Sequence, residues 1–282
     1  ISRLKEYKQK LSSLFNLDGR AGANELKELF PDTGKIFTNP KTIKLLSEFV
    51  SFSTSPGDLV LDFFSGSGTL SHAVYSVNAV TNEHRKYIAV QLAEETFDII
   101  EKVPEGKKGP AGEAFKHGYK TIADITKERI RRAGTKIKDE NPNSTTLDIG
   151  FRVLKIDSSN MNDVHYTPDA LAKGDLFNQV EHIKTDRSSE DLLFQVMLDW
   201  GVDLSLPIRK EIIEGKDVYF VNNDDLVACF DKGIDEALIK TLAAKQPLRV
   251  VFRDDGFVSD SVKINVEQIF KQLAPVTDIK AI

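Results

Sequence analysis

The chain has 282 residues, a net charge of −5, a hydrophobic content of 40% and a charged content of 29%. This composition is typical of an ordinary soluble, globular protein and excludes a disordered or membrane chain. No apolar run reaches the roughly 18 residues of a membrane span, and no secretory signal is recognisable. The length therefore predicts about two domains, and the single Cys229, which excludes an internal disulfide, predicts a reducing, cytoplasmic setting.

The first half of the chain predicts an α/β arrangement. Helices are expected where apolar residues recur at helical spacing, and strands where short apolar or alternating runs occur. In chain order the sequence predicts helices over residues 2–16, 41–52, 69–78 and 121–134, strands over 58–64, 86–92 and 148–157, and a Gly-, Pro- and Lys-rich loop over 103–118.

The second half predicts a smaller α/β domain. Residues 158–185 lack periodicity and are predicted to be a linker, and a Ser followed by Glu and Asp predicts the start of a helix over 188–201. Beyond it we expect strands over 218–223, 226–231, 248–254 and 276–282, and helices over 236–245 and 263–274. The predicted domains are therefore residues 1–157 and 186–282.

Charge is distributed unevenly between the two halves. Residues 158–282 hold 14 Lys/Arg against 22 Asp/Glu, which is a poor match for nucleic acid. The basic residues of the first half are concentrated in 127–138, with six of them beside Glu128. That stretch is either a helix facing phosphates or a solvated helix face, and the second interpretation is the more common.

The stretch "DLVLDFFSGSGTLSHAV" places a glycine loop between a strand and a helix. This is the usual place for a nucleotide-like cofactor in an open α/β sheet. Gly66 and Gly68 let the backbone approach a ligand closely, and the following helix N-terminus favours a negative group.

Three cofactor classes compete for this loop. A phosphate-binding loop needs a Lys-Ser/Thr pair after the second glycine, which this sequence lacks, and a dinucleotide loop prefers Gly or Ala where Ser71 stands. S-adenosylmethionine (AdoMet) has no phosphate and needs a tight glycine loop around its methionine and ribose, so it fits best. A glycine turn without a ligand is the remaining alternative.

The same stretch resembles the AdoMet-binding motif of amino-methylating DNA methyltransferases of the β arrangement. Upstream, "IFTNPKTIKLL" resembles the motif that precedes the cofactor loop, and downstream "RKYIAVQLAEE" resembles the strand whose end contacts the ribose. Together with "TIADITKERIRRAG", "GFRVLKIDSSN", "SEDLLFQVMLDWG" and "RVVFRDDGF", the order resembles the modification subunit of type III restriction–modification systems, a DNA adenine N6-methyltransferase. The resemblance implies an AdoMet-dependent methyltransferase (Rossmann-like) partial sheet in the first domain and an accessory α/β domain after it.

The resemblance also implies which residues bind AdoMet. Asp62 would accept a hydrogen bond from the ammonium, Phe64 would cover one side of the cofactor, and Gln91 stands where many methyltransferases place an acidic residue on the ribose hydroxyls. Lys41 would lie near the carboxylate, or is a surface lysine at a helix start. The full set is Thr38, Asn39, Pro40, Lys41, Asp62, Phe64, Ser65, Gly66, Gly68, Thr69 and Gln91.

Several other residues are predicted to be structural. Phe63 and Trp200 should belong to the core, and His72 should be packed or solvated rather than catalytic. Thr42 replaces the family's usual second proline, which should leave that turn less rigid. The histidines show no metal-ligand spacing, so no metal site is predicted.

One motif of the family is missing. Methylation of an exocyclic amine requires an Asp/Asn-Pro-Pro-aromatic motif that holds the flipped-out base, and none of the ten prolines is followed by another. In the β arrangement this motif and the target-recognition region precede the cofactor motifs, so both would lie upstream of Ile1. We therefore expect a C-terminal, cofactor-binding portion that is not catalytic alone, in a protein that binds DNA, a second modification subunit and a restriction subunit. The alternatives are an assembly module without enzymatic activity and, with less support, a dinucleotide-dependent enzyme.

Overall fold

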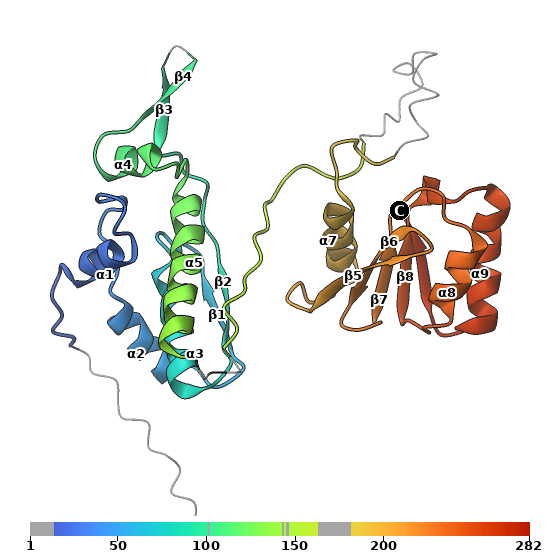
Figure 1. The fold of residues 1–282 in the computed structure, drawn as a ribbon, viewed down its shortest axis with the longest axis horizontal. Coiled ribbons are helices and arrows are strands. Elements are labelled where there is room, and N and C mark those ends of the chain that lie inside the picture. The colour runs from blue at the N-terminus through green and yellow to red at the C-terminus, as the bar shows by residue number, and fades with distance from the viewer. Residues whose placement is uncertain (1–13, 101, 143, 145–146, 163–181) are drawn as a thin grey trace, which may run out of the picture. The chain divides into compact units, whose positions relative to one another are not determined.

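The computed structural model describes residues 14–100, 102–142, 144, 147–162 and 182–282. The chain divides into two compact units, Ile1–Phe151 and Arg152–Ile282 (Figure 1). The domain boundaries drawn from the sequence stay a prediction, since most of the predicted linker lies outside the described residues.

The first unit is a mixed α/β structure. Its elements are α1 (Ala21–Leu29), α2 (Ile43–Ser53), β1 (Leu59–Asp62), α3 (Thr69–Thr81), β2 (Lys86–Ala89), β3 (Phe97–Ile100), β4 (Val103–Gly106), α4 (Pro110–Lys116) and α5 (Ile122–Glu140). Strands β1 and β2 are parallel and are joined through α3, whereas β3 and β4 form an antiparallel hairpin. Helix α3 packs against both α2 and α5. The helices predicted over 41–52, 69–78 and 121–134 and the strands predicted over 58–64 and 86–92 are confirmed.

Helix α5 is longer than predicted. A capping box starts it: Thr121 Oγ1 accepts a hydrogen bond from Asp124 N, and Asp124 Oδ2 accepts one from Thr121 N. The sequence predicted an end at Gly134, but the helix continues to Glu140. A Cβ at position 134 would lie 3.1 Å from Cβ of Ile149, so this glycine admits a neighbouring segment rather than ending the helix.

Two predictions for the first unit need correction, and a third lies mostly outside the described residues. The loop predicted over 103–118 is wrong, because it contains β4 and α4; Pro110 occupies the first turn of α4, where proline needs no N–H partner. The strand predicted over 148–157 is wrong, because these residues pair with no strand and Ile149 O instead accepts a hydrogen bond from Tyr75 Oη (2.9 Å). The helix predicted over 2–16 lies outside the described residues except for 14–16, which are not helical.

The second unit is a three-layer α/β structure. Its elements are α7 (Ser189–Asp199), β5 (Ile208–Ile213), β6 (Lys216–Val221), β7 (Leu226–Cys229), α8 (Glu236–Ala243), β8 (Arg249–Phe252), a 3-10 turn η2 (Asp254–Gly256), α9 (Asp260–Leu273) and β9 (Asp278–Ala281). The strands form one sheet in the order β5-β6-β7-β8-β9, antiparallel from β5 to β7 and parallel from β7 to β9. The predicted helices and strands of this half are confirmed, and β5 was missed.

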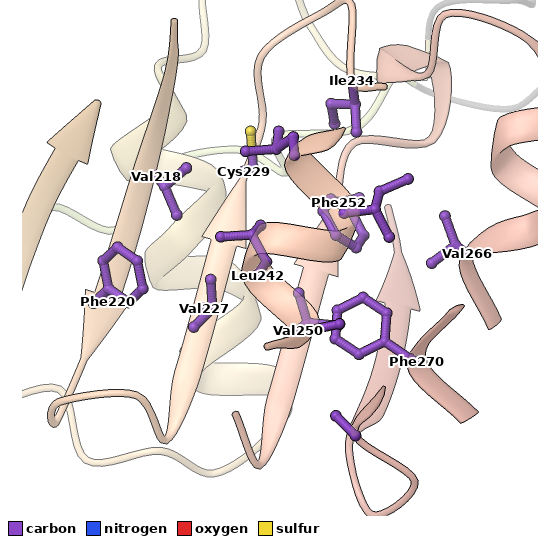
Figure 2. Close-up of a cluster of buried hydrophobic side chains, with 14 residues drawn as sticks. Val218, Phe220, Val227, Cys229, Ile234, Leu242, Val250, Phe252, Val266 and Phe270 are labelled. Atoms are coloured by element: carbon purple, nitrogen blue, oxygen red, sulfur yellow. The ribbon is translucent and has the colours of Figure 1, made fainter. Parts of the chain in front are cut away.

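Both faces of this sheet are apolar and covered. Side chains alternate along a strand, so Val218 and Phe220 of β6 belong to the buried cluster that also contains side chains of α8 and α9 (Figure 2), while Tyr219 and Val221 belong to the cluster that contains side chains of α7. Cys229 lies in the first of these clusters and is fully buried. Trp200 packs against the α7 side, which agrees with its predicted place in the core. The second unit therefore has a hydrophobic core of its own.

Candidate functional site

The glycine loop joins the end of β1 to the start of α3. Gly66 and Gly68 both have positive φ angles (54° and 77°), and Gly68 N donates to Ser65 O (2.7 Å), which makes the turn tight. Ser65 N donates to Val90 O (3.1 Å) and ties the loop to the segment that follows β2. The loop conformation is thus fixed by its own backbone and by the neighbouring strand end.

The missing side chains of the two glycines make room for protein atoms. A Cβ at Gly68 would lie 3.1 Å from Thr126 Cγ2 and 3.3 Å from Thr126 O on α5, and a Cβ at Gly66 would lie 3.3 Å from the Phe37 ring. The sequence predicted that these glycines admit the methionine part of a ligand. That role stays a prediction, and the requirement for glycine at 68 is already explained by the close approach of α5.

Two predicted polar ligands are bonded to the loop. Asp62 Oδ1 accepts a hydrogen bond from Phe64 N (3.1 Å), and Gln91 Oε1 accepts one from Gly66 N (2.7 Å). The amide of Gln91 therefore braces the loop, and its contact with a ribose hydroxyl stays a prediction. Phe64 is 84% exposed and its ring is available to a ligand.

The predicted ligands differ in their exposure. The exposed ones are Thr38, Asn39, Lys41 and Phe64, the half-buried ones are Pro40, Asp62, Gly66 and Gln91, and the buried ones are Ser65, Gly68 and Thr69. The contact between Phe37 and Gly66 brings the segment 38–41 and the glycine loop together.

The segment around residue 40 is anchored by α1. A Cβ at Gly22 would lie 2.1 Å from Pro40 O, so only glycine fits there. Glu25 Oε1 accepts a hydrogen bond from Thr42 Oγ1 (2.7 Å), and Glu25 Oε2 accepts one from Ile43 N (2.7 Å). The sequence predicted a less rigid turn because Thr42 replaces a proline; the hydroxyl instead makes a bond that proline could not make.

One face of the β1–β2 pair is exposed and apolar. Val60 and Tyr87 pack with α2 and α3. The alternate side chains form an apolar sheet face that is at least 42% exposed at each position: Leu59, Leu61, Phe63, Ile88 and Val90. The prediction that Phe63 belongs to the core is wrong, because within the described residues nothing covers this face.

A buried arginine below the loop was missed by the sequence reasoning. Arg129 of α5 is fully buried, and its Nη1 donates to Ser67 Oγ (2.9 Å) and Thr69 Oγ1 (2.7 Å). Thr126, one turn earlier, donates from Oγ1 to Gly66 O (2.5 Å). The spacing in the sequence could have predicted this burial, because Arg129 lies four residues after the apolar Ile125 and therefore on the same, buried face of α5.

The remaining basic residues of 127–138 are largely paired. Arg132 bonds Asp32 and Glu128, Arg131 pairs with Glu128, and Lys127 pairs with Asp124. The hydrogen bond from Arg132 lowers the pKa of Asp32 to about 2. These pairs favour the interpretation of this stretch as a solvated helix face.

His72 should make the first unit less stable in mild acid. Burial, assisted by the charge of Arg129, lowers the pKa of His72 from 6.5 to about 3. The unfolded chain thus binds a proton that the folded chain does not. Stability is lost as the pH falls from about 6.5 toward 3, by about 1.4 kcal/mol per pH unit. Urea unfolding at pH 7.5, 6 and 5 checks this, with His72→Gln expected to have a shallower pH slope; equal slopes would contradict it.

The groups at the loop fit a ligand that carries both an ammonium and a carboxylate group, as AdoMet does. Asp62 is a carboxylate suited to an ammonium group, Phe64 presents an aromatic face, and the first N–H groups of α3 favour a carboxylate. Ser65 Oγ is buried and has no hydrogen-bond partner among the described residues. Within the residues that the structure describes, no cluster of His, Cys, Asp and Glu side chains could hold a metal ion. No helix among these residues is long and apolar enough to span a membrane.

A family comparison matches the part of the chain that holds the glycine loop. Residues 2–102, which include the segment 38–41, the glycine loop and Gln91, match the family described as DNA methylase.

Three known DNA-modification proteins are similar to part of the chain. The chain is 48% identical over 152 residues to the Mod subunit of the type III restriction–modification enzyme EcoP15I from Escherichia coli, a match covering 54% of this chain and 20% of that protein. It is 34% identical over 134 residues to the StyLTI Mod subunit of Salmonella typhimurium, covering 47% and 18%. It is also 30% identical over 116 residues to the type II methyltransferase M.KpnI of Klebsiella pneumoniae, covering 41% and 24%. The predicted resemblance to type III modification subunits is confirmed, and the matched part spans about a fifth of the length of these relatives.

Proposed function

We propose that residues 38–91 form the AdoMet-binding part of a DNA adenine N6-methyltransferase, the modification subunit of a type III restriction–modification system. The observation that carries this proposal is the Gly66–Gly68 turn between β1 and α3, with Asp62 and Gln91 bonded to it. Its place within the stretch that matches the DNA methylase family supports the assignment.

The chain's own residues would bind and orient the cofactor. Asp62 would accept a hydrogen bond from the ammonium group, the N-terminus of α3 and Lys41 would favour the carboxylate, and Phe64 would cover one side. Gln91 would share its carbonyl oxygen between the loop and a ribose hydroxyl. AdoMet supplies an activated methyl group when bound. The parallel β1–β2 pair would belong to a Rossmann-like sheet.

Transfer of the methyl group requires residues that this chain does not contain. No Asp/Asn-Pro-Pro-aromatic motif occurs in the 282 residues, so nothing here would hold and orient the target amine. We propose that this chain binds the cofactor but does not transfer the methyl group alone. In the complete protein the partners would be DNA, a second modification subunit and a restriction subunit.

Calorimetric titration with AdoMet and, separately, with NAD tests the proposed cofactor. We expect binding of AdoMet only. Asp62→Asn keeps an oxygen for Phe64 N but removes the charge, so AdoMet affinity should fall about 10-fold or more, the order of a charged hydrogen bond. Asp58→Asn, on the segment just before β1, is the matched control and should bind like the wild type. Binding of NAD, or equal AdoMet affinity in Asp62→Asn and wild type, would contradict the assignment.

The second unit is a candidate for assembly rather than for DNA binding. It has its own core, and residues 158–282 hold 14 Lys/Arg against 22 Asp/Glu. A surplus of acidic charge repels phosphates, so the second unit should bind duplex DNA only weakly at physiological salt. Fluorescence anisotropy with labelled duplex and residues 152–282 checks this. Sub-micromolar, salt-sensitive affinity would overturn the assembly role.

A further inference from the structure

Buried polar atoms without a hydrogen-bond partner are concentrated around the glycine loop. Among the described residues they are Ser65 Oγ, His72 Nδ1, Arg129 Nε, Arg129 Nη2 and, in the second unit, Arg187 Nε. Folded proteins leave few such groups, and each calls for an explanation. Arg129 is the largest case in the first unit, because two nitrogens of one charged group are involved.

Among the described residues, Arg129 donates hydrogen bonds only to the loop and to the first residue of α3. Its Nη1 donates to Ser67 Oγ and to Thr69 Oγ1, both buried side chains whose oxygens lie 3.4 Å apart. Thr126 on the same face of α5 donates to Gly66 O. Helix α5 thus holds three positions of the loop and the start of α3: the carbonyl of residue 66, the side chain of 67 and the side chain of 69.

The guanidinium keeps its charge although it is buried. Burial lowers the pKa of Arg129 to about 10, and the negative charge of Glu25 opposes that shift, so the group is protonated at neutral pH. Glu25 itself holds Thr42 and Ile43 at the start of α2. The positive charge of Arg129 therefore holds the glycine loop, and the negative charge of Glu25 holds the start of α2, next to the segment 38–41.

Stability alone does not account for a charge at this position. A buried charge with unbonded nitrogens is usually less favourable than an apolar side chain of similar size, and such exceptions are expected at functional sites. We propose that Arg129 is a positioning residue, which holds Ser67 and Thr69 so that the Gly66–Gly68 turn keeps the conformation that receives AdoMet. The proposal rests on the proposed function, and Arg129 acts through the loop without touching the cofactor.

The test compares Arg129→Met, which removes the charge, with Arg129→Lys, which keeps it. Arg131→Met is the matched control, since Arg131 lies two residues away on α5 and is largely exposed. Three quantities are measured on the full chain: the thermal unfolding midpoint, amide hydrogen exchange of residues 65–70, and the dissociation constant for AdoMet.

We expect Arg129→Met to unfold at the wild-type temperature or above, to exchange the loop amides at least 10-fold faster, and to bind AdoMet at least 10-fold more weakly. Arg129→Lys should restore most of the loop protection and of the affinity, and Arg131→Met should match the wild type in all three. Ser67→Ala should weaken binding as well, and adding it to Arg129→Met should cause little further loss, because both act on one contact.

Unchanged loop exchange in Arg129→Met would overturn the proposal, as would faster exchange with unchanged AdoMet affinity. A lower unfolding midpoint with unchanged affinity would assign Arg129 a purely structural role and also overturn it. If the wild-type chain binds no AdoMet, the proposed function fails, whereas the loop exchange still decides whether Arg129 orders the turn.

Discussion

Gly68→Val is expected to destabilise the first unit by about 2–5 kcal/mol. The φ of 77° is the left-handed region, which costs an L-residue about 1–2 kcal/mol. The new side chain would also meet Thr126, whose Cγ2 lies 3.1 Å from the Cβ position, and overpacking adds about 1–3 kcal/mol. Denaturant-dependent hydrogen exchange of residues 59–81 measures the loss.

Gly57→Val is the matched control for this substitution. Gly57 has a similar φ of 85°, but nothing lies within 4 Å of its Cβ position, so only the backbone strain of about 1–2 kcal/mol applies. The difference between the two variants isolates the clash with α5. Equal losses at both positions would show that α5 does not approach the loop as described. If Gly68→Val loses more stability than Gly57→Val, a loss of AdoMet binding in Gly68→Val reflects a damaged fold as well as a filled loop.

The chain should associate with itself as its concentration rises. The apolar sheet face carries five exposed large side chains, and β1 pairs with β2 alone among the described strands, which leaves one edge open. Both features favour pairing with another polypeptide.

Sedimentation equilibrium over a range of concentrations measures the association. Leu61→Lys combined with Ile88→Lys places two charges on neighbouring strands of this face and should shift the chain toward monomer. Val80→Lys, at an exposed position on α3, should leave the association unchanged. A single 31.5 kDa species at high concentration in the wild type would show that the face and edge are covered, and that the association prediction is wrong.

The sequence predicts elements well where one local pattern decides the structure. The β1–loop–α3 unit follows from an apolar run, two glycines and a helical period, and the start of α7 follows from Ser188 and Asp191, which form a capping box. The hairpin β3–β4 and the short α4 were missed because Pro, Gly and Lys in residues 103–110 have the composition of a loop, and contacts with Phe97 and Phe115 decide their structure instead.

The site was harder to predict than the fold. Asp62 and Gln91, which the resemblance implies as AdoMet ligands, both lie beside the loop, since parallel strands β1 and β2 end at the same edge. Their role as ligands stays a prediction. Arg129 was missed because it lies in a basic run whose other members face solvent, so its charge concealed its buried position. Phe63 was wrongly assigned to the core because its burial depends on what covers the sheet, which no local pattern encodes.

Cys229 has a practical consequence for labelling. It is the only cysteine, it is enclosed between the sheet and its helices, and burial raises its pKa to about 11. At pH 8 only about one thiol in a thousand would be ionised, and even that fraction is shielded from reagents. A cysteine introduced at the exposed position 64 would therefore be the only thiol that reacts with a maleimide dye. The unsubstituted chain, treated with the same dye, gives the background fluorescence.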